Sequence, residues 1–134
     1  MSNATARRIG AAYLRKVGIE LQPGDLGSDL EGDFAQAAQQ AGLPHPKRER
    51  KLIPGKQWAS DFVWPAEKVV VEVEGGTRHG KGRHSRGAGF DEDCRKYFHL
   101  SMAGYLVIRV TGTHIQSGEA VDWVRAALAL RSTL

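Results

Sequence analysis

The segment that most constrains the fold is Val69–Gly76, with the sequence VVVEVEGG. Four valines in five positions predict a buried β-strand, because β-branched residues favour strands. Side chains alternate between the two faces of a strand, so the odd-numbered valines share one face while Glu72 and Glu74 follow Val70 on the other. Burying an ionised carboxylate without a partner is strongly unfavourable. The strand therefore requires something that compensates its two glutamates.

A second strand adds a third carboxylate. Trp58–Trp64 has the composition of a strand, and a four-residue connection joins it to the valine strand. If the two form an antiparallel hairpin with Trp64 opposite Val69, then Asp61 lies opposite Glu72 on the same face. This expectation depends on the register, because a slip of one residue would turn Asp61 to the other face.

The three carboxylates of Asp61, Glu72 and Glu74 would repel one another on a shared face and so require a cation. The two strands offer no lysine or arginine on that face. Oxygen ligands suit hard divalent ions, which favours Mg²⁺ or Mn²⁺. The alternative is an acidic stripe that faces solvent on a half-exposed sheet.

The rest of the chain predicts an α/β sandwich with a mixed sheet. We expect a leader over residues 1–26, as a short helix or partly disordered, and one domain over residues 27–134. The domain has the predicted order αβββαβα. Besides the two strands above, its predicted elements are helices near 28–40, 91–103 and 119–131, a basic edge strand near 47–53 and a strand near 105–111.

The composition of the chain limits its possible binding partners and its cellular location. The formal net charge is +4, and two basic clusters favour a polyanion such as nucleic acid, with a solvated surface as the alternative. The chain has no apolar run of membrane-spanning length and no signal-peptide pattern, so we expect a cytoplasmic protein without a membrane partner. The single cysteine, Cys94, excludes an internal disulfide. We expect it in the core beside Phe90 and Phe98.

A known pattern matches these residues. Asp61, ten intervening residues and then Glu72-Val73-Glu74 resemble the catalytic signature of the PD-(D/E)XK nuclease superfamily. The longer pattern DFVWPAEKVVVEVEGG…RHSRGAGFDEDCRKY…GYLVIRVT is similar to small phage-type and very-short-patch-repair-like members, over about residues 28–130. The resemblance implies the restriction-endonuclease-like αβββαβ core, a central mixed sheet flanked by helices.

The resemblance also implies a metal-dependent endonuclease that hydrolyses phosphodiester bonds in DNA. Asp61, Glu72 and the Val73 carbonyl would hold Mg²⁺ (or Mn²⁺), and Glu74 would orient a water or help hold a second ion. Glu74 stands where most members have lysine. Lys96 in the next helix is our candidate for a displaced lysine that stabilises charge on the phosphate, with an ion pair to Asp93 as its alternative role.

Glu31 resembles the acidic residue that many members carry on the first helix near the metal. Its alternative role is to complete a capping box with Ser28. The sequence does not decide between four kinds of DNA substrate: branched junctions, mismatched duplexes, duplexes of a specific sequence and single strands. Members of this fold often act as homodimers that cut both strands, although the sequence marks no dimer surface.

The glycine-rich segment from Gly75 to Gly89 is interpreted as a flap that contacts DNA, because glycine lets the backbone approach a phosphate closely. An ordinary surface loop is the alternative. Two rival functions also stay open: a DNA-binding module of the same fold without catalysis, and a small interaction domain. The predicted DNA-contacting residues are Arg78, His79, Lys81, Arg83, His84 and Arg86 in the flap, with Lys47 and Arg48 on the basic strand.

Overall fold

A computed structural model describes residues 29–75 and 87–133 of the chain. The predicted leader and nearly all of the predicted flap lie outside these residues. The elements follow the order α3 (Leu30–Gln40), β1 (Lys47–Lys51), β2 (Ala59–Trp64), β3 (Val69–Val73), α4 (Ala88–Met102), β4 (Leu106–Val110), α5 (Gly112–Ser117) and α6 (Glu119–Ser132).

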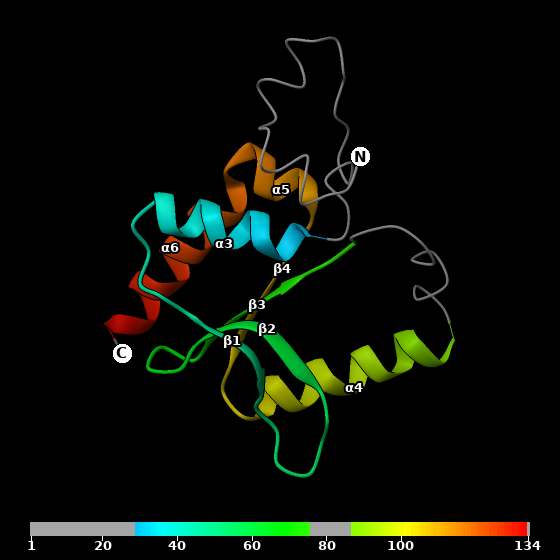
Figure 1. The fold of residues 1–134 in the computed structure, drawn as a ribbon. Helices are drawn as coiled ribbons and strands as arrows, with labels where there is room; N and C mark the ends of the chain where they lie inside the picture. Colours follow the sequence, from blue (N-terminus) through cyan, green and yellow to red (C-terminus); the bar gives the residue numbers. More distant parts are fainter. Residues whose placement is uncertain (1–28, 76–86, 134) are drawn as a thin grey trace, which may run out of the picture.

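The four strands form one mixed sheet in the order β1-β2-β3-β4 (Figure 1). β1 pairs with β2 and β2 with β3 in antiparallel fashion, whereas β3 and β4 are parallel. The parallel pair needs a crossover, and α4 provides it. Trp64 lies opposite Val69, so the predicted hairpin register is confirmed.

The main core lies between one face of the sheet and helices α3, α5 and α6. Phe62 and Val71 lie opposite each other in the sheet and are fully buried there. The ring of Phe34 on α3 meets Phe62 edge-on, with ring centroids 4.9 Å apart. Phe62 and Trp64, both on β2, are buried.

Helix α4 covers the other face of the sheet, on the side away from α3 and α6 (Figure 1). Val63 and Val70 lie opposite each other on that face and are fully buried, and Leu100 is the buried residue of α4. Helices on both faces explain why the valine strand is buried on both sides. The result is an α/β architecture with the restriction-endonuclease-like core that the sequence predicts.

Two local predictions need correction, and one helix was not expected. Helix α3 is capped by Asp29, whose Oδ1 accepts a hydrogen bond from the Gly32 amide at 3.0 Å, so the predicted capping box of Ser28 and Glu31 is wrong by one residue. Helix α4 begins at Ala88, three residues earlier than expected. The short helix α5 was not predicted, because its six residues are fewer than periodicity can reveal.

The prediction that Cys94 belongs to the core is also wrong, because its side chain is exposed. Lys96 and Leu100 set the inward face of α4, and Cys94 lies on the opposite side of the helix with two exposed aromatic residues, Phe90 and Phe98. None of the helices in the described ranges is long and apolar enough to cross a membrane.

Candidate functional site

The site begins where β2 and β3 separate. Their pairing runs from Trp64 opposite Val69 to Phe62 opposite Val71. One position further along, the Oδ2 atom of Asp61 accepts a hydrogen bond of 2.7 Å from the amide of Val73. At this position, a hydrogen bond to a side chain replaces the backbone hydrogen bonds between the two strands. It fixes the Asp61 carboxylate at the end of the hairpin.

Three carboxylates from three elements meet at this point. Glu31 comes from α3, Glu49 from β1 and Asp61 from β2, and one oxygen of each lies within 4.8 Å of the others. Two oxygen ligands on opposite sides of a Mg²⁺ or Ca²⁺ ion are roughly 4–5 Å apart. The residues present therefore fit a hard divalent cation, and we call this set the acid cluster.

Glu49 was not among the predicted site residues. It is the one acid in the basic sequence KRERK, which indicated only a charged edge strand. Its backbone has a φ of 54°, in the left-handed region that residues other than glycine rarely adopt. Such outliers gather at functional sites. A lone acid within a basic run is the sequence signal that could have identified Glu49.

Burial and mutual repulsion raise the pKa values of two carboxyl groups in the acid cluster, those of Glu31 and Asp61. Burial, followed by the charges of Asp61 and Glu49, raises the pKa of Glu31 to about 7. Arg48 partly opposes this rise, because its Nη2 atom lies 3.5 Å from Glu31 Oε1. At neutral pH, Glu31 is therefore divided between its protonated and ionised forms.

The pKa of Asp61 is also raised. Burial raises its pKa to about 6, and the charges of Glu72 and Glu49 add to the rise. The hydrogen bond from Val73 and the charge of Lys96 act in the opposite direction. A cation at the acid cluster would relieve this repulsion and favour the ionised forms.

The second carboxylate of the predicted motif, Glu72, has a lysine as its partner. Its side chain is buried, and Lys96 Nζ lies 2.9 Å from Glu72 Oε2. Within the described part of the chain, Oε2 is buried and forms this ion pair. Burial raises the pKa of Glu72, and the ion pair with Lys96 opposes that rise.

Lys96 extends from α4 to this end of the hairpin. Its Nζ also donates a hydrogen bond of 2.8 Å to the carbonyl of Ala59 at the start of β2. The structure therefore places this lysine against Glu72, in place of the alternative pairing with Asp93.

The third carboxylate, Glu74, is held by two further residues. Tyr97 Oη donates a hydrogen bond of 2.9 Å to Glu74 Oε2, and Arg109 Nε donates one of 3.1 Å to the same atom. The Arg109 guanidinium also lies 4.9 Å from the centre of the Tyr97 ring. Burial, and then the Glu74 charge, raises the pKa of Tyr97, so its phenol stays protonated.

The predicted metal ligands thus fall into two groups. Asp61 belongs to the acid cluster with Glu31, whereas Glu72 and Glu74 already have cationic partners from α4 and β4. Sequence reasoning missed Arg109 because β4 is remote in the chain, yet Arg109 pairs with Glu72 in the parallel register. The Val73 residue between the glutamates supplies the amide that holds Asp61.

Two of the predicted DNA-contacting residues fall within the described ranges. Lys47 and Arg48 are exposed on β1, beside the acid cluster. Arg48 also stacks over the ring of Phe62, with its Cζ 4.6 Å from the ring centre. The predicted flap residues lie outside the described residues: Arg78, His79, Lys81, Arg83, His84 and Arg86.

Comparison with solved structures identifies a protein of similar fold. The chain is similar to the catalytic domain of the homing endonuclease I-Bth0305I, with a TM-score of 0.58 and 15% sequence identity. The likeness covers 75% of this chain and 94% of that domain. No family model and no curated protein matches the sequence. At this level of identity, what the two chains are shown to share is the fold.

Proposed function

We propose that this protein is a divalent-metal-dependent DNA endonuclease of the PD-(D/E)XK type. The acid cluster beside the basic strand β1 is the observation that carries this proposal. The similar fold of a homing endonuclease catalytic domain supports it. The substrate class is DNA, since the exposed basic residues of β1 suit contacts to phosphates.

Asp61 would hold Mg²⁺ or Mn²⁺ together with Glu31 and Glu49. The sequence motif predicts Glu72, Val73 and Glu74 as ligands instead, and Asp61 is common to both sets. We favour the acid cluster because Glu72 and Glu74 are already neutralised by the protein. When bound, the ion would polarise the phosphoryl oxygen and lower the pKa of a water.

The chain itself would perform the remaining tasks. Asp61 is held by the Val73 amide, so it presents a fixed carboxylate to the cation. Lys96 extends from α4 to the Glu72 side of Asp61 and would stabilise negative charge on the phosphate. Glu31 would be ionised in the presence of the ion and would act as a ligand with Asp61 and Glu49.

The test is cleavage of plasmid and branched DNA in the presence of Mg²⁺ or Mn²⁺. Asp61→Asn preserves an acceptor for the Val73 amide but removes the charge, and it should reduce cleavage at least ~100-fold. Asp122→Asn, on the exposed surface of α6, is the matched control and should cleave like the wild type. Equal activity of the Asp61 and Asp122 variants would refute the proposal.

A further variant separates the two ligand sets. Glu49→Gly removes a carboxylate while relieving the positive φ of that residue. If the acid cluster holds the ion, this variant should fold at least as well as the wild type and bind Mn²⁺ about 10-fold or more weakly by calorimetry. Unchanged Mn²⁺ affinity would favour the ligand set of the motif.

One observation favours a second candidate, a DNA-binding module of the same fold without catalysis. Lys96 is committed to Glu72 and to the Ala59 carbonyl, and Glu74 replaces the usual lysine. A module of this kind would bind DNA but neither bind divalent ions strongly nor cut. The same calorimetry and cleavage assays distinguish the two candidates.

A further inference from the structure

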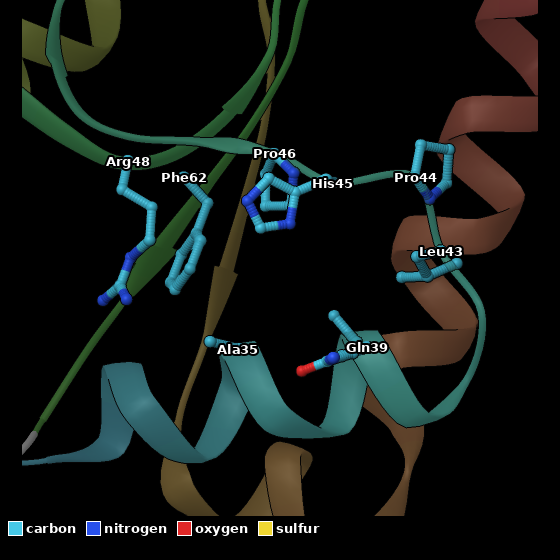
Figure 2. Close-up of a pocket in the computed structure, with 9 residues that line it drawn as sticks. Ala35, Gln39, Leu43, Pro44, His45, Pro46, Arg48 and Phe62 are labelled. Atoms are coloured by element: carbon cyan, nitrogen blue, oxygen red, sulfur yellow. The ribbon is translucent and has the colours of Figure 1, made fainter.

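A cavity of about 310 Å³ lies between helix α3 and the segment that leads into β1 (Figure 2). Small side chains on α3 leave the space open, and the chain above it closes the other wall. Figure 2 shows Ala35 and Gln39 on the helix side of the space, while Arg48 and Phe62 reach from the sheet toward the helix. The residues that matter for its chemistry are Ala35, Gln39, Pro44, His45, Arg48 and Phe62.

The wall above α3 is fixed in place. Trp64 is buried, and its indole Nε1 donates a hydrogen bond of 2.8 Å to the carbonyl of Pro44. Pro44 and Pro46 flank His45 and restrict the backbone there. The cavity is therefore held open by the fold and does not depend on a ligand for its shape.

The lining combines apolar walls with a few polar groups. Ala35 and Pro44 offer apolar surface, whereas Gln39 and His45 are exposed at the opening. A glutamine amide is a donor and an acceptor side by side, which matches the hydrogen-bonding edge of a nucleobase. The volume is at the lower end of the range of small-molecule sites, about 300–1,000 Å³, and so suits a single base.

Arg48 connects this cavity to the acid cluster. Its guanidinium lines the cavity, stacks over Phe62 and lies 3.5 Å from Glu31. A positive group at this place complements a phosphate that bridges the cavity and the cluster. The neighbouring positions on β1, Lys47 and Arg50, are basic and exposed as well.

We propose that the cavity receives the base of an unpaired nucleotide in DNA, while Arg48 contacts the adjoining phosphate. Taking a base out of a duplex costs a few kcal/mol, and the cost is smallest for a base that is mismatched or already unpaired. Such a pocket would therefore select DNA with an unpaired nucleotide over fully paired DNA. This inference rests on the proposed function for its link to cleavage, but binding tests it separately.

The experiment measures binding in EDTA, without a metal, by fluorescence anisotropy of two labelled duplexes. One duplex is fully paired and the other carries a single unpaired adenine. The wild type should bind the second at least ~10-fold more tightly, which corresponds to about 1.4 kcal/mol. Ala35→Phe fills the cavity and should reduce this preference to less than ~3-fold, because the base no longer fits.

The matched control is Gln36→Phe, because Gln36 is the next residue of α3 and its side chain is exposed. It introduces the same aromatic ring outside the cavity and should keep the wild-type preference. Gln39→Leu alters an exposed side chain and tests the cavity even if Ala35→Phe fails to fold. It should reduce the preference for the duplex with the unpaired adenine, because leucine cannot form hydrogen bonds with the base.

The outcomes separate this inference from the proposed function. A preference for the unpaired duplex that Ala35→Phe or Gln39→Leu removes supports the pocket, even if no variant cleaves DNA. Cleavage by the wild type without any such preference overturns the pocket and leaves the nuclease proposal standing. A preference that both variants retain also overturns the pocket.

Discussion

At the scale of single residues, the acid cluster is a place where three like charges are held together by folding. Glu31 and Asp61 have ordinary pKa values of 4.5 and 3.8, and the fold raises them to about 7 and about 6. Both groups therefore keep a proton in the folded protein at pH values where the unfolded chain has released it. Without a cation, these residues oppose folding at neutral pH.

This predicts how stability depends on pH when EDTA removes divalent ions. Between about pH 4 and pH 7 the folded state binds more protons, so the free energy of unfolding should fall as the pH rises. The urea midpoint of the wild type should be higher at pH 5 than at pH 7.5, and Asp61→Asn should weaken this dependence. A midpoint that rises with pH equally in both proteins would contradict the prediction.

At this scale, the sequence predicts some of the residues that the structure brings together, while their roles stay predictions. Asp61, Glu31 and Lys96 were predicted as site residues, and the structure brings them to one end of the hairpin. The partners of Glu72 and Glu74 were not foreseen in full, because Tyr97 and Arg109 reach them from elements distant in the chain. Contacts between elements depend on packing geometry that a single sequence does not encode in any local pattern.

At the scale of elements, helix α4 is attached to the sheet through a buried ion pair. The side chains of Glu72 and Lys96 are only 5% and 12% exposed, so both charges are largely removed from water. Removing one partner of such a pair leaves an uncompensated charge, whereas replacing both by apolar side chains is often tolerated. The pair therefore makes α4 sensitive to single substitutions in particular.

Lys96→Met should lower the free energy of unfolding by about 3–5 kcal/mol at pH 8, where Glu72 would have to stay charged or take up a proton. Combining it with Glu72→Met should restore most of that loss. Urea denaturation of the two single variants and the double variant measures the coupling. Strictly additive effects of the two substitutions would show that the ion pair does not couple α4 to β3.

Element order and pairing were largely predictable. The valine strand, the hairpin register and the mixed sheet follow from alternation and from the short connection between the strands. The cap of α3 lies one residue from its predicted position, because Ser28 and Asp29 are neighbouring residues of the kind that cap helices. The start of α4 lies three residues from its predicted position, because this helix begins after Gly87 without a side-chain cap. The exposed position of Cys94 could not be foreseen, since Phe90 and Phe98 beside it indicated a core.

At the scale of the whole molecule, the basic residues are unevenly distributed. The formal net charge is +4, and β1 alone carries four basic residues on an exposed edge beside the acid cluster. A polyanion approaching this edge meets cationic side chains before it meets the carboxylates. The distribution suits a site that must bring a phosphate close to a group of acids.

The salt dependence of DNA binding should reflect this distribution. Arg50→Ala with Lys51→Ala should reduce the slope of log K against log salt by up to about 2, since each phosphate contact contributes roughly 0.9. Arg125→Ala on α6 serves as the control and should leave the slope unchanged. Filter binding between 50 and 200 mM salt, roughly the range over which such contacts are lost, provides the measurement. An unchanged slope in the double variant would place the DNA elsewhere.

The edge position of β1 has a consequence for how such a protein diverges. Glu49 lies on a strand that has a single hydrogen-bonded neighbour and exposed side chains, whereas other elements form the core. If the acid cluster holds a metal as proposed, substitutions along this border would alter metal affinity at little expense to folding. A shared fold is therefore a poor guide to a shared chemistry. Closely related chains could keep the same core and still differ in their requirement for a metal.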